Sequence, residues 1–140
     1  GLGTDGCAAN NNLDIFTEMD SAAKLAKVYR LDPTALDAVT VLRMATIDGA
    51  RALGMESIIG SLEIGKKADI IVVDTNQPHL TPLYNPYSQL VYAATGADVC
   101  HTMVNGEVLM RNRHLQTLDL SEVLADARSQ AKRVMAWVKA

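Results

Sequence analysis

The chain has 140 residues, a mass of 15.1 kDa and a formal net charge of −3. A complete (β/α)8 barrel needs about 250 residues, so this chain is too short to form one. Its 49% hydrophobic and 21% charged residues exclude wholesale disorder. Because the 13 Lys and Arg residues are scattered without a basic stripe, we expect no nucleic-acid partner.

The first 12 residues are rich in Gly and Asn and predict a loop, in which residues 1–4 are the end of a strand. A helix is predicted from Leu13 to about Arg30, with Asn11 or Asn12 as its N-cap. The apolar residues that recur at helical spacing are Ile15, Met19, Ala22, Ala26 and Tyr29.

A second helix is expected to begin at Asp32-Pro33, since Asp is a good cap and Pro is tolerated in the first turn. It should continue to about Ala45. Thr46 then predicts the cap of a short third helix that stops near Gly54. These helices form a first block, residues 1–57.

The second block, residues 58–140, contains strand signals. The apolar run from Ala68 to Asp74 is typical of a strand buried on both faces. Runs at 99–104 and 107–110 flank Asn105-Gly106, which is the strongest short signal for a β-hairpin.

Two further helices are predicted in this block. Pro86 can begin a short helix through about Ala94, after an irregular Pro-containing connection. The last helix should run from about Leu120 to Val138, with Asp119 and Glu122 resembling a capping box.

Cysteine usage and apolar runs predict the compartment. Cys7 and Cys100 cannot make a disulfide framework, which favours a reducing cytoplasm. No apolar run approaches the 18 or so residues of a membrane span. The opening lacks an initiator Met and a signal peptide, and is expected to be the interior of a longer polypeptide.

Asp5 is the strongest candidate for a catalytic or metal-binding role. It follows a short strand-like segment and precedes a Gly-containing loop, the position in which barrel enzymes keep catalytic groups. A carboxylate there can bind a cation or accept a proton from metal-bound water. The structural alternative is an Asp that bonds backbone amides in a turn. Cys7, close by, is expected to be a small packing residue rather than a nucleophile, because no His lies near it in sequence.

Four segments together resemble the metal-dependent amidohydrolase superfamily, and in particular its 5-methylthioadenosine/S-adenosylhomocysteine deaminase group. They read GTDGCAANNNLDIF, MATIDGARALGM, IGSLEIGKKADIIVVD and PHLTPLYNPYSQLVYAATGADVCHTMVNGEVL. The likeness covers nearly the whole chain in order. One departure is Ala9, where a Ser is expected beside the Asn run.

The resemblance implies a fold. The chain would be an α/β fragment, α+β when taken alone. Residues 1–57 would be the end of the last barrel strand with its helices, and residues 58–140 the C-terminal part of a small composite β-sandwich with its hairpin and terminal helix.

The resemblance also implies a site. Asp5 matches the Asp that binds the catalytic metal, most often zinc, and moves protons during water attack on a purine nucleoside. The other ligands would be histidines upstream of Gly1. Asn10, Asn11 and Asn12 are candidates for substrate contact or for helix capping. The histidines of this chain are instead expected to be surface or packing residues; they are His79, His101 and His114.

Because catalytic zinc normally has three protein ligands, the chain alone is expected to bind no metal tightly and to be inactive. Two alternatives stay open. The parent enzyme could act on another C–N or C–Cl bond, as a guanine deaminase or triazine hydrolase does, or the chain could be a non-catalytic, self-associating α+β module. Helix faces that lack their barrel strands predict a homo-oligomer in either case.

Overall fold

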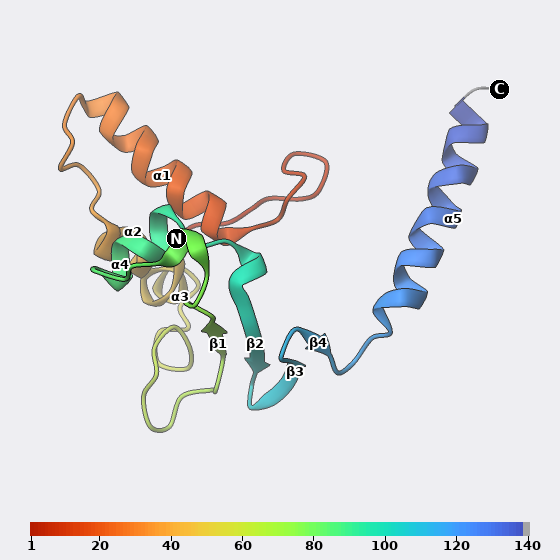
Figure 1. Ribbon diagram of the computed structural model, residues 1–140. Helices are drawn as coiled ribbons and strands as arrows, with labels where there is room; N and C mark the ends of the chain where they lie inside the picture. Colours follow the sequence, from red (N-terminus) through yellow and green to blue (C-terminus); the bar gives the residue numbers. More distant parts are fainter. Residues whose placement is uncertain (139–140) are drawn as a thin grey trace.

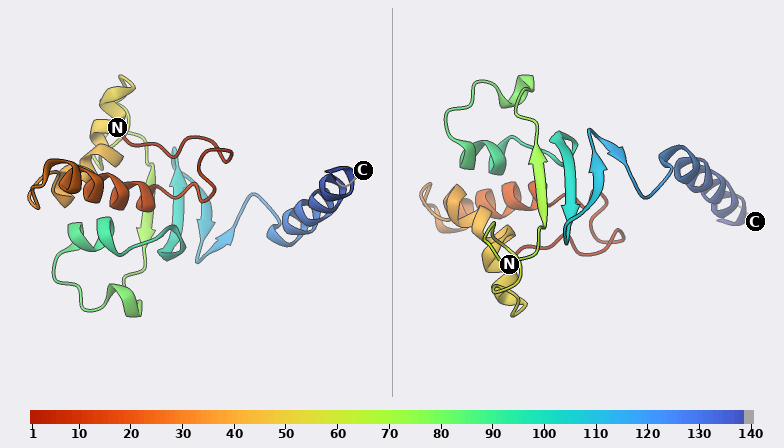
Figure 2. Two further views of the ribbon diagram at one scale, coloured as in Figure 1. Left: turned by 90° about the horizontal axis from the view of Figure 1, so that it is seen from above. Right: turned by 90° about the horizontal axis from the view of Figure 1, so that it is seen from below.

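The computed structural model describes residues 1–138, which contain five α-helices and four short strands joined by turns and loops. Helices α1, α2 and α4 pack together beyond the end of the sheet where β1 stops and β2 starts, and α5 extends away from both (Figures 1 and 2). The α-helices are α1 (Ile15–Arg30), α2 (Ala38–Ala45), α3 (Ile47–Ala52), α4 (Pro86–Tyr92) and α5 (Leu120–Val138). The strands are β1 (Ile70–Val73), β2 (Val99–Val104), β3 (Glu107–Arg111) and β4 (His114–Leu115), and short 3₁₀ turns lie at Pro78–Leu80 and Gly96–Asp98.

The first helix begins at Ile15, and its N-cap is Asp14, so the prediction of Asn11 or Asn12 as the cap is wrong. Asp14 has the extended backbone conformation of a cap residue, and its Oδ1 accepts a hydrogen bond from the Phe16 N–H at 3.0 Å. Asn12 Oδ1 accepts instead from the Asp14 N–H, at 3.4 Å, one residue before the helix begins.

The predicted helix start at Asp32-Pro33 is also wrong, because this segment forms turns. The Asp32 carboxylate accepts from both the backbone N–H and the hydroxyl of Thr34, at 2.8 and 2.7 Å. Leu36 then has a left-handed φ of 53°, which no helix continues through. Helix α2 begins only at Ala38, with Asp37 as its cap.

Helix α2 ends at Ala45 as predicted, and α3 follows from Ile47. Thr46 separates them, but its hydroxyl donates to the Leu42 carbonyl at 2.7 Å and makes no cap bond to α3. The Thr46 side chain therefore bonds to the end of α2 and does not cap α3. Gly54 lies just past α3 with φ +68°, the left-handed stop that was expected.

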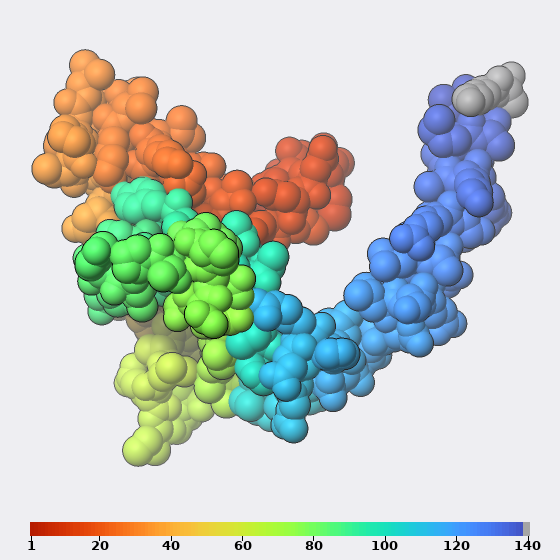
Figure 3. Space-filling view, viewed as in Figure 1, coloured from red at the N-terminus to blue at the C-terminus, as the bar shows by residue number. Residues whose placement is uncertain are grey.

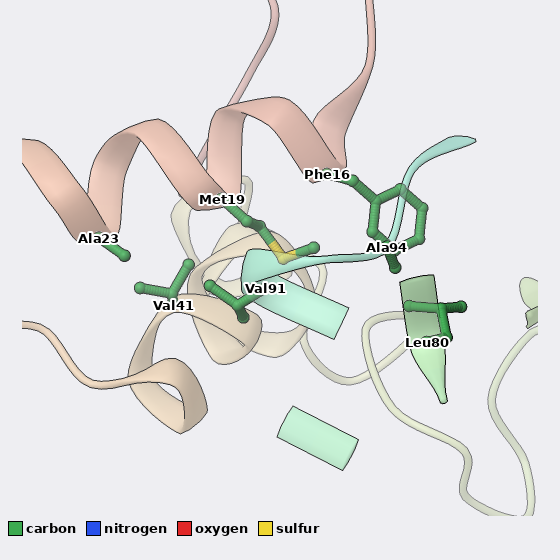
Figure 4. Close-up of a cluster of buried hydrophobic side chains, with 7 residues drawn as sticks. All are labelled: Phe16, Met19, Ala23, Val41, Leu80, Val91 and Ala94. Atoms are coloured by element: carbon green, nitrogen blue, oxygen red, sulfur yellow. The ribbon is translucent and has the colours of Figure 1, made fainter. Parts of the chain in front are cut away.

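A small apolar core holds α1, α2 and α4 together (Figure 4). Met19 of α1 meets Val91 of α4, and the Phe16 ring reaches Ala94 and the 3₁₀ turn that carries Leu80. Burying a side chain of this size stabilises a fold by about 1.5–3 kcal/mol. The core residues are Phe16, Met19, Ala23, Val41, Leu80, Val91 and Ala94.

The four strands form one antiparallel sheet in the order β1-β2-β3-β4. The predicted hairpin is confirmed: Asn105 and Gly106 connect β2 to β3 with φ values of 51° and 84°. Strand β4 was not predicted, because two residues give no measurable periodicity. A turn with two left-handed residues, Asn112 and Arg113, brings it back against β3.

Strand β1 is not buried on both faces, contrary to the prediction. It lies at the sheet edge and pairs only with β2. Ile71 and Val72 keep 50% and 46% of their surface exposed. The apolar run therefore has more hydrophobic surface than residues 1–138 cover.

The two ends of the described chain differ in how they are held. Residues 1–6 form no strand, and one hydrogen bond from Leu2 N to the Met44 carbonyl, at 3.3 Å, ties them to α2. Helix α5 has the predicted bounds, and Asp119 Oδ1 accepts from the N–H groups of Ser121 and Glu122. No residue of α5 is buried, as its isolated position in Figure 3 shows. Within residues 1–138, no helix has the length and apolar character needed to cross a membrane.

Candidate active-site loop

The segment before α1 is a tight, exposed loop. The N–H groups of Ala9 and Asn10 both donate to the Gly6 carbonyl at 2.9 Å, which closes a turn. Asp5 immediately precedes it and has a left-handed φ of 57°. Asp tolerates this region better than most residues, and such conformations are found at sites where a side chain must be aimed.

The two oxygens of the Asp5 carboxylate have different surroundings. The Gly6 N–H donates to Oδ1 at 2.7 Å, which fixes the orientation of the carboxylate. The Asp5 residue is exposed, and Oδ2 has no hydrogen-bond partner among residues 1–138. Oδ1 therefore accepts the backbone hydrogen bond of the turn, while Oδ2 is left to bind a cation or accept a proton.

The Asn side chains connect this loop to the first turns of α1. The Asn10 amide donates to Glu18, and the Asn12 amide donates to the Thr17 hydroxyl at 3.2 Å. Asn11 is exposed, and no contact of its side chain is observed within residues 1–138. Substrate contact by Asn10 or Asn11 stays a prediction, with Asn11 the side chain that is available for it.

Cys7 and the histidines lie outside any metal-binding arrangement. Cys7 is exposed on the loop. His79 Nε2 contacts Asp98 Oδ2 at 3.0 Å, and His114 Nδ1 lies 2.8 Å from the Asn112 carbonyl oxygen. Across residues 1–138, no three His, Cys, Asp or Glu side chains gather where they could hold a metal ion. Asp5 alone does not fit a zinc ion, which needs about three protein ligands.

Asp98, at the 3₁₀ turn before β2, is 4% exposed and is the one ionisable residue that is buried among residues 1–138. Its burial acts to raise the carboxyl pKa, but hydrogen bonds from His79 and from the Thr95 N–H and hydroxyl outweigh that effect and lower the pKa below its ordinary 3.8. Asp98 is therefore a structural anion that holds the two 3₁₀ turns together.

We expect the chain to show no stoichiometric, submicromolar binding of Zn²⁺, because one exposed carboxylate competes poorly with water and buffer for the ion. Isothermal titration of the chain with Zn²⁺ measures this. Tight one-to-one binding that Asp5→Asn removes would show that a complete site exists after all.

A largely apolar hollow of about 790 Å³ lies among the helices and the first strand. The N-terminal residues, α1, α2, α3 and β1 all contribute to it, and Asp5 and the Asn residues do not. Leu42, Ile59 and Ile71 are among the side chains that line it. It is a packing surface in character and offers few polar groups to orient a substrate.

The fold and this loop place the chain in a known class. The amidohydrolase family matches residues 1–109, most of the chain, and the chain belongs to that family.

Individual relatives are more specific. The chain is 56% identical over 139 residues to a 5-methylthioadenosine/S-adenosylhomocysteine deaminase of Syntrophus aciditrophicus, covering 99% of this chain and 31% of that protein. It is 52% identical, with 99% and 32% covered, to a 5′-deoxyadenosine deaminase of Methanosarcina acetivorans. The chain thus spans about a third of the length of these relatives.

A solved structure supports the fold. An adenosine deaminase from Xanthomonas campestris, crystallised with bound zinc, superposes with a TM-score of 0.92 at 45% identity, over 97% of this chain and 31% of that one. Helices and a small antiparallel sheet in this arrangement therefore form part of an amidohydrolase fold. Which portion of barrel and sandwich they represent, and the division at residue 57, stay predictions.

Two acidic residues that organise this region were not identified from the sequence. The cap of the first helix was predicted at Asn11 or Asn12, although Asp14, directly before an apolar periodic run, is itself a cap signal. Asp98 ends the pattern Thr95-Gly-Ala-Asp98, which has the spacing of a capping box and forms one.

Proposed function

We propose that this chain supplies the reactive carboxylate of an amidohydrolase that hydrolytically deaminates a 5′-substituted adenosine, such as methylthioadenosine or S-adenosylhomocysteine. The observation that carries the proposal is the state of Asp5: exposed, held through Oδ1 by the Gly6 N–H, and with Oδ2 available. The three deaminases of adenosine-type nucleosides named above are 56%, 52% and 45% identical to this chain. Triazine hydrolases of known structure also match, but they are only 26% and 27% identical. The higher identity favours an adenosine-type substrate over a triazine ring.

The chemistry assigned to Asp5 is proton transfer. Water attacks the ring carbon that bears the amino group, and Asp5 accepts the proton that the water loses. The C–N bond then breaks, and the same proton goes to the departing ammonia, so that the ring amino group is replaced by oxygen. Asp5 is also the residue of this chain that would ligate a divalent metal, with zinc implied by the family, and the remaining ligands would lie outside residues 1–138.

The chain by itself is proposed to be inactive and to associate. Its apolar hollow and the half-exposed Ile71 and Val72 leave hydrophobic surface that favours contact with further polypeptide. A homo-oligomer is the form of that contact we expect for the isolated chain. Membership of the amidohydrolase family counts against the alternative of a purely non-catalytic module.

A chimera tests the proposed function. The chain replaces the matching 31% of the Syntrophus aciditrophicus relative. We expect the purified chimera to release ammonia from methylthioadenosine or S-adenosylhomocysteine with loss of adenine absorbance, while the chain alone releases none. A chimera that folds but deaminates no adenosine derivative would contradict the proposal.

A further inference from the structure

One carboxylate connects the active-site loop region to the sheet across 82 residues of sequence. Asp14 Oδ1 accepts from the Phe16 N–H at 3.0 Å and caps α1. Its other oxygen, Oδ2, accepts from the Gly96 N–H at 2.9 Å, at the 3₁₀ turn that leads directly into β2. The half-buried Asp14 thus has a separate backbone partner for each oxygen.

Gly96, the partner of Asp14 in this contact, has no side chain, and this leaves room for the carboxylate. A Cβ at Gly96 would lie 3.3 Å from Asp14 Oδ2 and 3.4 Å from both Cγ and Oδ1. A side chain there would crowd the whole carboxylate. The turn itself is anchored by buried Asp98, which accepts from the Thr95 N–H at 2.8 Å.

Hydrogen bonds also connect Asp14 and the start of α1 to the loop that contains Asp5. The Asn12 side chain accepts from the Asp14 N–H at 3.4 Å and donates to Thr17. Asn10 donates to Glu18 in the same part of α1, and its N–H donates to the Gly6 carbonyl. Asp5 is therefore linked to the start of α1, and the start of α1 to the sheet.

We infer that Asp14 is a positioning residue. Its two carboxylate oxygens bond to separate segments, and together they hold the Asp5 loop in a fixed position relative to the start of β2. The inference rests on the proposed function only in treating Asp5 as the reacting group. Asp14 itself caps a helix and takes no part in the proposed proton transfer.

Asp14→Asn separates this role from capping. Asn caps helices as well as Asp does, but it offers one oxygen to two N–H groups, so one of them faces an NH₂ group. Asp37→Asn is the matched control, because Asp37 caps α2 by accepting from Thr40 N at 2.8 Å and, among residues 1–138, bonds only to its own helix. Asp14→Ser is a second variant: Ser caps well but is too short to reach Gly96.

The readout is loop motion. In a Cys100→Ser background, a nitroxide on the exposed Cys7, two residues from Asp5, reports mobility by electron paramagnetic resonance. We expect both Asp14 variants to sharpen the Cys7 spectrum and to raise the Gly96 amide exchange rate about tenfold, the effect of losing one hydrogen bond. We expect Asp37→Asn to change neither.

Two results would overturn the inference: a Cys7 spectrum unchanged by Asp14→Asn and Asp14→Ser, or one changed equally by Asp37→Asn. A lower melting temperature of the Asp14 variants, with no change in the spectrum of the Cys7 label, would show that Asp14 has a structural role only. Because the label reports motion and not turnover, this outcome is independent of deaminase activity. An inactive chimera would contradict the proposed function and leave the positioning result standing.

Discussion

Asp5→Asn in the chimera is expected to lower kcat for methylthioadenosine by about 10²–10⁴-fold, the usual contribution of a positioned acid–base group. The reason is local. Asn can still accept the Gly6 N–H that fixes Asp5 Oδ1, so the turn is retained. At the position of Oδ2, however, the carboxylate that can take up a proton is replaced by an amide that cannot. Steady-state kinetics of ammonia release measure the change.

Asp32→Asn is the matched control for this substitution. It removes the same charge from an exposed turn, where Asp32 bonds only Thr34 among the described residues and Asn can replace it. Activity should stay within about twofold of the parent chimera, which is the scatter usual for surface changes. If Asp5→Asn kept comparable activity, Asp5 would be a turn residue with no chemical role.

Local signals predicted those parts of the fold that depend on neighbouring residues. The Asn105-Gly106 hairpin, the helix started by Pro86 and the cap at Asp119 were all predicted correctly, and each is determined within a few residues of the chain. In each case backbone geometry and side-chain chemistry favour the same structure.

Local signals were wrong where two local structures compete. Asp32 has the chemistry of both a helix cap and a turn, and the bonds to Thr34 decide for the turn. The β1 run was predicted as a doubly buried strand from its composition, but composition does not reveal how much covering structure is present. Ile71 and Val72 are about half exposed and point to opposite faces of the sheet, so neither face of β1 is fully covered within residues 1–138.

The candidate site could be predicted only in part for a related reason. Asp5 and the Asn run are contiguous, so pattern and resemblance identify them. Asp14 with Gly96, and His79 with Asp98, are partners that lie far apart in sequence. No period or spacing connects such pairs, and only the folded chain brings them together.

Asp98→Ala is expected to destabilise the chain by about 1–3 kcal/mol, the usual cost of leaving buried hydrogen-bond donors without their acceptor. The side chain is buried, and its Oδ2 serves the Thr95 N–H, the Thr95 hydroxyl and His79 Nε2, at 2.8, 3.1 and 3.0 Å. Ala leaves these groups without their acceptor. Because the turn also holds Gly96, the contact to Asp14 should weaken as well. Urea denaturation at pH 7 gives the free energy of unfolding, and exposed Asp126→Asn is the control for the change in charge.

The pH dependence follows from the lowered pKa of Asp98. A carboxyl group whose pKa is lower in the folded state than in the unfolded state stabilises the fold above the unfolded value, and that contribution is lost as pH falls through the folded value. The stability difference between the parent and Asp98→Asn should therefore be constant above about pH 5 and shrink as the pH falls below the ordinary 3.8. Asp98→Asn is the variant for this comparison, since its amide oxygen can still accept from Thr95 while it cannot ionise. A difference that stays constant down to pH 2, or that grows on acidification, would mean that the charge of Asp98 contributes nothing to holding the two turns together.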